Sequence, residues 1–204
     1  MSSRIHLMIR TIGAIAVAGA GILSGSCTST ITDSKSNSLL VIDRLTGVAG
    51  GVAEEETTLQ SDVVTTEGGV FEDVGQVVFR LLLKDPGSPT VPNVATTNNF
   101  ITVNRYRVEY TRADGQNRPG IDVPFAWDGA FTVTVRAEGS AAASFVLVRI
   151  QAKREPPLTS LWQCGGSCAI TMIAKVTFFG HDQTGRAVQA SGNIQIDFAN
   201  WADE

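Results

Sequence analysis

Alternation of apolar and polar residues is the feature that most constrains what this chain can fold into. Residues 100–111 read FITVNRYRVEYT, and their apolar and charged side chains alternate, so they fall on opposite sides of an extended strand. The apolar side carries Tyr106, Val108 and Tyr110, and the charged side carries Arg105, Arg107 and Glu109. A period of two with one polar side predicts a strand with one buried face.

The same reasoning predicts a chain made almost entirely of strands. Alternation recurs in residues 130–137 and 187–198, where Gly192 marks a possible bulge. Nearly continuous apolar runs predict further strands at 39–45, 75–83, 143–152 and 169–179. Residues 46–66 are expected to form a loop with a weak strand at 61–64, and the segment 153–163 could hold one helical turn. Turn clusters such as ADGQN at 113–117 separate these runs.

About seven to eight short strands, with no long helix after Leu23, predict an all-β fold and specifically an antiparallel β-sandwich. The last 35 or so residues resemble the closing strands of bacterial immunoglobulin-like domains. The residues that carry this resemblance are Val176, Phe178, Asp182, Gly185, Val188 and Ala190. The resemblance implies an immunoglobulin-like sandwich, although the Cys-Trp-Cys framework of antibody domains is absent.

The N-terminal segment has the layout of a secretory signal peptide. Arg4 and Arg10 precede 13 apolar or small residues at 11–23, and three small residues then lead to Cys27. Because a spanning helix needs about 20 apolar residues, this run is short for a membrane span. An uncleaved membrane anchor is the alternative.

The residues around Cys27 resemble the lipobox of bacterial lipoproteins. The matching stretch is Leu23, Ser24, Gly25, Ser26 and Cys27, although Ser24 stands where the motif usually has leucine. The resemblance implies cleavage before Cys27 and attachment of diacylglycerol and palmitate to that cysteine. Ordinary signal peptidase cleavage after Ser26 is the alternative. Thr28, rather than an aspartate, follows the cysteine, which by the same resemblance favours the outer membrane or periplasm over retention at the inner membrane.

These features divide the chain into a signal peptide (1–26), a lipidated cysteine with a Ser- and Thr-rich tether (27–38), and one β-sandwich domain (39–204). Removing Arg4 and Arg10 lowers the basic count from 16 to 14 against 20 acidic residues, so the net charge moves from −4 to −6. An acidic chain lacks the basic footprint that nucleic acid requires. The expected partners are therefore the membrane, through the lipid, and another envelope protein.

The remaining cysteines, Cys164 and Cys168, are expected to form a local disulfide if the compartment is oxidising. An odd number of cysteines in an exported protein is explained if Cys27 carries lipid. A redox pair or half of a metal site is the alternative. No metal site or cofactor is expected, because no further ligand lies nearby in the sequence and the spacing is not C-x-x-C.

Three residues are candidates for ligand binding: Trp127, Asp128 and Trp162. Exposed indole rings could form an aromatic platform for a sugar or peptide, and the alternative is that they close the ends of the core. On this basis the first hypothesis is a non-enzymatic envelope lipoprotein with a structural or protein-binding role. A carbohydrate-binding module is the second.

A secreted hydrolase is the third hypothesis. It would be built around His181, which is adjacent to Asp182, but no G-x-S-x-G motif accompanies it. Carboxylates in or near loops could also meet to bind calcium, although they lack the spacing of a calcium loop. These carboxylates are Asp114, Asp122, Asp128 and Asp182.

Overall fold

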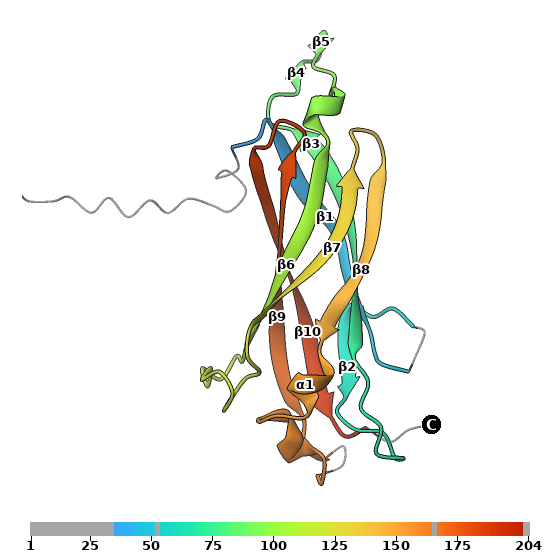
Figure 1. The fold of residues 1–204 in the computed structure, drawn as a ribbon, viewed down its shortest axis with the longest axis vertical. Coiled ribbons are helices and arrows are strands. Elements are labelled where there is room, and N and C mark those ends of the chain that lie inside the picture. The colour runs from blue at the N-terminus through green and yellow to red at the C-terminus, as the bar shows by residue number, and fades with distance from the viewer. Residues whose placement is uncertain (1–34, 52–53, 165–166, 202–204) are drawn as a thin grey trace, which may run out of the picture.

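Two β-sheets packed face to face form the body of the protein in a computed structural model, which describes residues 35–51, 54–164 and 167–201 (Figure 1). One sheet has the strand order β1-β3-β8, the other β2-β10-β9-β6-β7, and β4 pairs only with β5. The strands are β1 (Ser38–Val48), β2 (Thr58–Asp62), β3 (Asp73–Leu83), β4 (Gly87–Ser88), β5 (Val91–Pro92), β6 (Ile101–Thr111), β7 (Trp127–Val135), β8 (Ser140–Val148), β9 (Ile170–Asp182) and β10 (Ala187–Ala199). Within the described ranges, the short helical segments with assigned bounds are η1 (Thr97–Asn99), α1 (Ile150–Lys153) and η2 (Leu158–Leu161). The predicted all-β class is confirmed, and the immunoglobulin-like topology stays a prediction.

The strands pair antiparallel with one exception among the described residues, the parallel pair of β2 and β10. β2 lies in a region expected to be mainly loop. It forms a strand because Leu59 and Ser61 point into the interior and are fully buried beside the last strand. The predicted antiparallel pairing thus holds for the described strands apart from this edge.

The core lies between the sheets and contains side chains from both. The Phe79 ring from β3 lies 4.9 Å from the Phe178 ring of β9, and the Phe145 ring of β8 lies 5.0 Å from Tyr106 of β6. The alternation predicted for residues 100–111 is confirmed, since Tyr106 is buried whereas its neighbours Arg105 and Arg107 point outward. Burial of these rings removes apolar surface from water and stabilises the packed sheets.

Gly192 does not form the expected bulge. Its register with Val176 continues without a shift along the β9–β10 pair. A Cβ atom at this position would lie 3.0 Å from the Cδ2 atom of Leu45 and 3.3 Å from the Cδ1 atom of Ile42. The glycine therefore allows close approach of the facing sheet, which explains its place inside an alternating strand.

The sandwich is long and has two distinct ends (Figure 1). The upper end holds the start of β1 and the β4–β5 hairpin, and the lower end holds α1, η2 and the segment 112–126 between β6 and β7. The signal peptide, Cys27 and the tether as far as residue 34 lie outside the described residues. In the part of the chain that is described, no helix has the length and apolar character needed to cross a bilayer.

Candidate functional site

The outer face of the five-stranded sheet carries a cluster of charged side chains from β6 and β7, here called the arginine cluster: Arg105, Arg107 and Asp128. Arg105 Nη1 donates a hydrogen bond of 2.8 Å to Asp128 Oδ1, and Arg107 Nη1 donates one of 2.8 Å to Oδ2. The strand register places Arg107 opposite Asp128, so one carboxylate reaches both guanidinium groups. All three side chains are about half exposed. The cluster is therefore ordered yet open to solvent.

β9 extends this face with an aromatic ring and a histidine. The Arg105 guanidinium lies 4.0 Å from the centre of the Phe179 ring, which is a cation–π contact. Arg105 and His181 line an open hollow of about 440 Å³, and Arg105 and Asp128 line a second one of about 490 Å³ beside Ala130. Ordered arginine next to an aromatic ring is a combination that is enriched in protein interfaces.

A third hollow lies at the lower part of the same face, under the segment 112–126. It measures about 490 Å³ and lies between Glu109 and Lys175 of the sheet and Val123 of the segment. Arg118 fixes the segment through two hydrogen bonds of 2.7 and 3.0 Å to Asp122. The hydrogen bond from the Arg118 side chain is the main reason that the pKa of Asp122 falls to about 2.

The structure places Trp127 and Asp128 on opposite faces of β7. The Trp127 ring packs inward at 5.3 Å from Tyr106, and the Arg149 guanidinium lies 5.0 Å from its centre. A sugar stacking on that side of the indole would have to displace Arg149. Asp128 points outward into the arginine cluster, so these two candidates do not form one platform.

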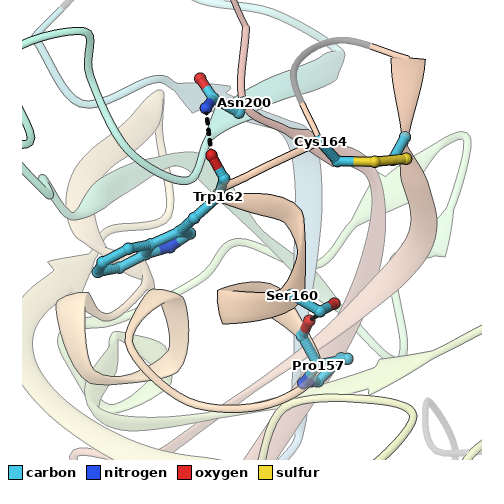
Figure 2. Close-up of a disulfide and its surroundings, with 6 residues drawn as sticks. Pro157, Ser160, Trp162, Cys164 and Asn200 are labelled. Atoms are coloured by element: carbon cyan, nitrogen blue, oxygen red, sulfur yellow. Dashed lines mark hydrogen bonds between the residues drawn. A yellow bond between two sulfur atoms is a disulfide. The ribbon is translucent and has the colours of Figure 1, made fainter.

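Trp162 lies at the lower end, directly after η2, and is half-buried against the core. Its Nε1 atom donates a hydrogen bond of 3.1 Å to the carbonyl oxygen of Lys153. Its own carbonyl oxygen accepts a hydrogen bond of 2.7 Å from Asn200 Nδ2 (Figure 2). The Trp162 indole thus links α1 to the end of η2. A ligand-binding role for Trp127, Asp128 or Trp162 stays a prediction.

Cys164 and Cys168 are joined as a disulfide close to Trp162 (Figure 2). Their Cα atoms lie 5.6 Å apart, within the range that a disulfide spans. Because only four positions separate the two cysteines, the bond closes a small loop and acts locally.

His181 and Asp182 point in different directions along β9. Asp182 is buried and accepts hydrogen bonds from Thr184 N, Thr184 Oγ1 and Arg186 N in the β9–β10 turn. Burial alone would raise the pKa of Asp182, but hydrogen bonds from Thr184, Ser36 and the turn backbone outweigh it and lower the pKa to about 2. Within the described ranges, no hydrogen bond joins the His181 ring to a serine or a carboxylate. The geometry therefore offers no assembled hydrolytic triad around His181.

The carboxylates considered for calcium are engaged separately. Asp114 pairs with Arg112 and Asp122 with Arg118, while Asp128 holds the arginine cluster and Asp182 the β9–β10 turn. Among the residues that the structure describes, no group of three or more His, Cys, Asp or Glu side chains is placed to hold a metal ion.

A second charged cluster, which the sequence reasoning missed, is buried at the lower end; it is called the buried clasp and consists of Ser61, Asp73 and Lys153. Lys153 Nζ lies 2.7 Å from Asp73 Oδ1 and 2.7 Å from the carbonyl oxygen of Asp62. Ser61 donates a hydrogen bond of 2.6 Å to Asp73 Oδ2. Because Ser61 belongs to one sheet and Asp73 to the other, the clasp ties the two sheets together.

Serine, lysine and aspartate are residue types that occur in hydrolytic sites, but here they are closed to substrate. The Lys153 and Asp73 side chains are 1% and 0% exposed, and Ser61 is fully buried. A nucleophile must reach its substrate, so the clasp is structural in this conformation. Its sequence signal is weak, because Lys153 and Asp73 lie 80 positions apart.

The arginine cluster is easier to recognise in the sequence than the buried clasp. Alternation alone places Arg105 and Arg107 on the polar face of their strand. Their partner Asp128 lies more than 20 positions away and Phe179 on a third strand, so only the sheet order brings these side chains together.

No protein-family model, curated protein or solved structure matches the chain.

Proposed function

We propose that the protein is a non-enzymatic lipoprotein of the bacterial cell envelope, anchored through Cys27 at the outer membrane or facing the periplasm. Its β-sandwich acts as a protein-binding module. The arginine cluster and the hollows beside it are the contact surface for another envelope protein.

The pairing of the cysteines is the observation that best supports a lipid anchor at Cys27. Cys164 and Cys168 pair with each other, which leaves Cys27 as the thiol without a cysteine partner in the chain. That residue directly follows the apolar run and small residues of the N-terminal segment. A disulfide also suits an oxidising compartment outside the cytoplasm. Lipid attachment explains both the odd count and the position of the third cysteine.

The chemistry of the outer sheet face supports protein binding over catalysis. Arg105, Arg107 and Phe179 provide charge, hydrogen-bond donors and an aromatic surface, and the hollows beside Arg105 are open to solvent. Arginine and aromatic residues dominate binding hot spots. The buried clasp of Ser61, Asp73 and Lys153 is closed to substrate. Among the described residues no serine or carboxylate is hydrogen-bonded to the His181 ring, so neither place supports an enzymatic role.

Intact mass and membrane partitioning test the anchor. The wild-type chain is expected to begin at Cys27 and to carry a diacylated or triacylated cysteine, and Cys27→Ala is expected to lose both the lipid mass and the membrane fraction. Ser26→Ala is the matched control, because it keeps a small residue before the cysteine and is expected to be lipidated. A wild-type chain without lipid would refute the anchor.

Site-specific photo-crosslinking in cells tests the binding face. Ala130 and Ala142 form a matched pair, because both are exposed alanines but lie on the outer faces of opposite sheets. A crosslinker at position 130 is expected to capture one envelope protein, and Arg105→Glu with Arg107→Glu is expected to abolish that adduct. A crosslinker at position 142 is expected to capture none. Equal capture at both positions would contradict the assignment of the face.

A further inference from the structure

The β4–β5 hairpin at the upper end exposes apolar side chains that the core does not use. Val91 is 71% exposed, Val94 is 78% exposed and Leu82 of the neighbouring β3 is 41% exposed. Leu82 and Val94, together with Pro86 and Ala95, line an open hollow of about 320 Å³. Exposed apolar groups gathered at one place indicate a contact surface.

The hairpin is held in shape by its own hydrogen bonds. Asn93 N donates to the carbonyl oxygen of Pro86 at 2.9 Å, and Gly87 N donates to Asp85 Oδ1 at 2.9 Å. Gly87 has a φ of 75° and its position faces the backbone of Val91, so a side chain there would be strained. The valines are therefore presented on an ordered tip.

The hairpin lies next to the point where the N-terminal segment enters the sandwich. Lys84 N donates a hydrogen bond of 3.0 Å to the carbonyl oxygen of Asn37, and Asn37 and Val94 line the same hollow. Cys27 precedes Asn37 by ten positions, which at about 3.3–3.6 Å per residue spans at most about 35 Å. The 13 residues of β10 alone extend over about 40 Å. A lipid at Cys27 therefore holds Asn37, at the upper end of the sandwich, within about 35 Å of the bilayer, a reach shorter than the strand β10.

We propose that the β4–β5 hairpin is a second membrane contact, in which Val91 and Val94 enter the boundary between headgroups and acyl chains of the bilayer that holds the Cys27 lipid. This inference rests on the proposed lipid anchor. The adjacent Lys84 and Asp85 have opposite charges, and Glu138 lines the same hollow as Val94. Because these charges give no net attraction to anionic lipid, insertion depends on apolar contact. This contact would hold the long axis of the sandwich away from the membrane. The arginine cluster, on the outer face of the five-stranded sheet, would then face parallel to the membrane surface.

Quenching of tryptophan fluorescence by brominated lipid tests this contact. Val94→Trp is compared with Ile121→Trp, a matched change of an exposed aliphatic residue (56% exposed) in the segment 112–126 at the other end. Each lipidated protein is placed in phosphatidylcholine vesicles with brominated or plain acyl chains. Val94→Trp is expected to lose at least half of the emission that it adds to wild type, and Ile121→Trp is expected to lose none.

The experiment separates failure of the hairpin contact from failure of the anchor. If intact mass reveals no lipid on Cys27, the same thiol is coupled to a maleimide lipid in the vesicles, since Cys164 and Cys168 are paired. Quenching in that sample would support the hairpin contact although the natural anchor had failed. Equal quenching at positions 94 and 121, or no quenching at 94 and in a Val91→Trp variant, would overturn the contact. Adding Val91→Asp to Val94→Trp is expected to reduce the quenching about twofold or more.

Discussion

The buried clasp and the arginine cluster use the same kind of ion pair in opposite environments. Lys153 and Asp73 are 2.7 Å apart and essentially inaccessible, whereas Arg105 and Asp128 are 2.8 Å apart with side chains 50% and 42% exposed. Although the two distances are nearly equal, the two ion pairs are expected to contribute very differently to the free energy of unfolding. Water screens the exposed pair, while the buried pair has lost its hydration and depends on its protein partners.

The two clusters also connect different parts of the molecule. The clasp joins β2, β3 and the helix α1, and in the described part of the chain these elements share no β-sheet. The arginine cluster joins β6 and β7, which already pair along their length. We therefore infer that the clasp is needed for folding, and that the arginine cluster is free to serve binding.

Removal of the buried cation is expected to have the largest effect. Lys153→Ala leaves the Asp73 carboxylate buried without its counter-charge, so the free energy of unfolding should fall by about 3–5 kcal/mol. Urea denaturation followed by circular dichroism measures the change. Lys175→Ala is the control, because Lys175 is exposed on β9, and it should change stability by less than about 0.5 kcal/mol. Equal losses for the two variants would contradict the stabilising role assigned to the buried clasp.

Asp182 is an intermediate case, a buried carboxylate held by hydrogen bonds from the β9–β10 turn. Its folded pKa of about 2 lies below the ordinary value of 3.8. The ionised form therefore stabilises the fold above about pH 4, and this contribution is lost as the pH falls from about 4 towards 2.

Asp182→Asn should accordingly lower the free energy of unfolding by about 1.5–3 kcal/mol at pH 7, the range for a hydrogen bond to a charged group. Urea denaturation between pH 2 and pH 7 is the measurement. The difference between wild type and variant should shrink as the pH approaches 2. A difference that stays constant with pH would show that the carboxylate charge is not what holds the turn.

The smallest effect on stability is expected in the arginine cluster. Asp128→Ala should lower the free energy of unfolding by about 0–1 kcal/mol, because its ion pairs are exposed. In 1 M salt, where charges are screened beyond about 3 Å, the effect should decrease further. The same variant should nevertheless reduce the crosslink from position 130, since it releases both arginines from their fixed positions. A large loss of stability with an unchanged crosslink would reverse the roles assigned to the two clusters.

Local patterns predicted most of the strands and few of their partners. The alternation around Tyr106 and the apolar run before Phe179 are repeated within a few residues, so they can be recognised in the sequence. β2 was largely missed because only two of its side chains, Leu59 and Ser61, are buried, and they are covered by a strand more than 130 positions away. The role of Gly192 cannot be predicted from sequence, because a glycine inside a strand is equally compatible with a bulge and with close packing of a second sheet.

The sequence by itself determined the all-β class, the outward placement of Arg105 and Arg107, and the expectation of a local Cys164–Cys168 bond. Each of these follows from residues close together in the chain, where the period of a strand or the reach of a short loop limits the geometry. Only the tertiary structure decided that Trp127 and Asp128 face apart, that Asp128 bridges two arginines, and that Lys153 meets Asp73 inside the lower end. Those contacts depend on sheet order and on which face turns inward, and both are set by packing of the whole core rather than by any one segment.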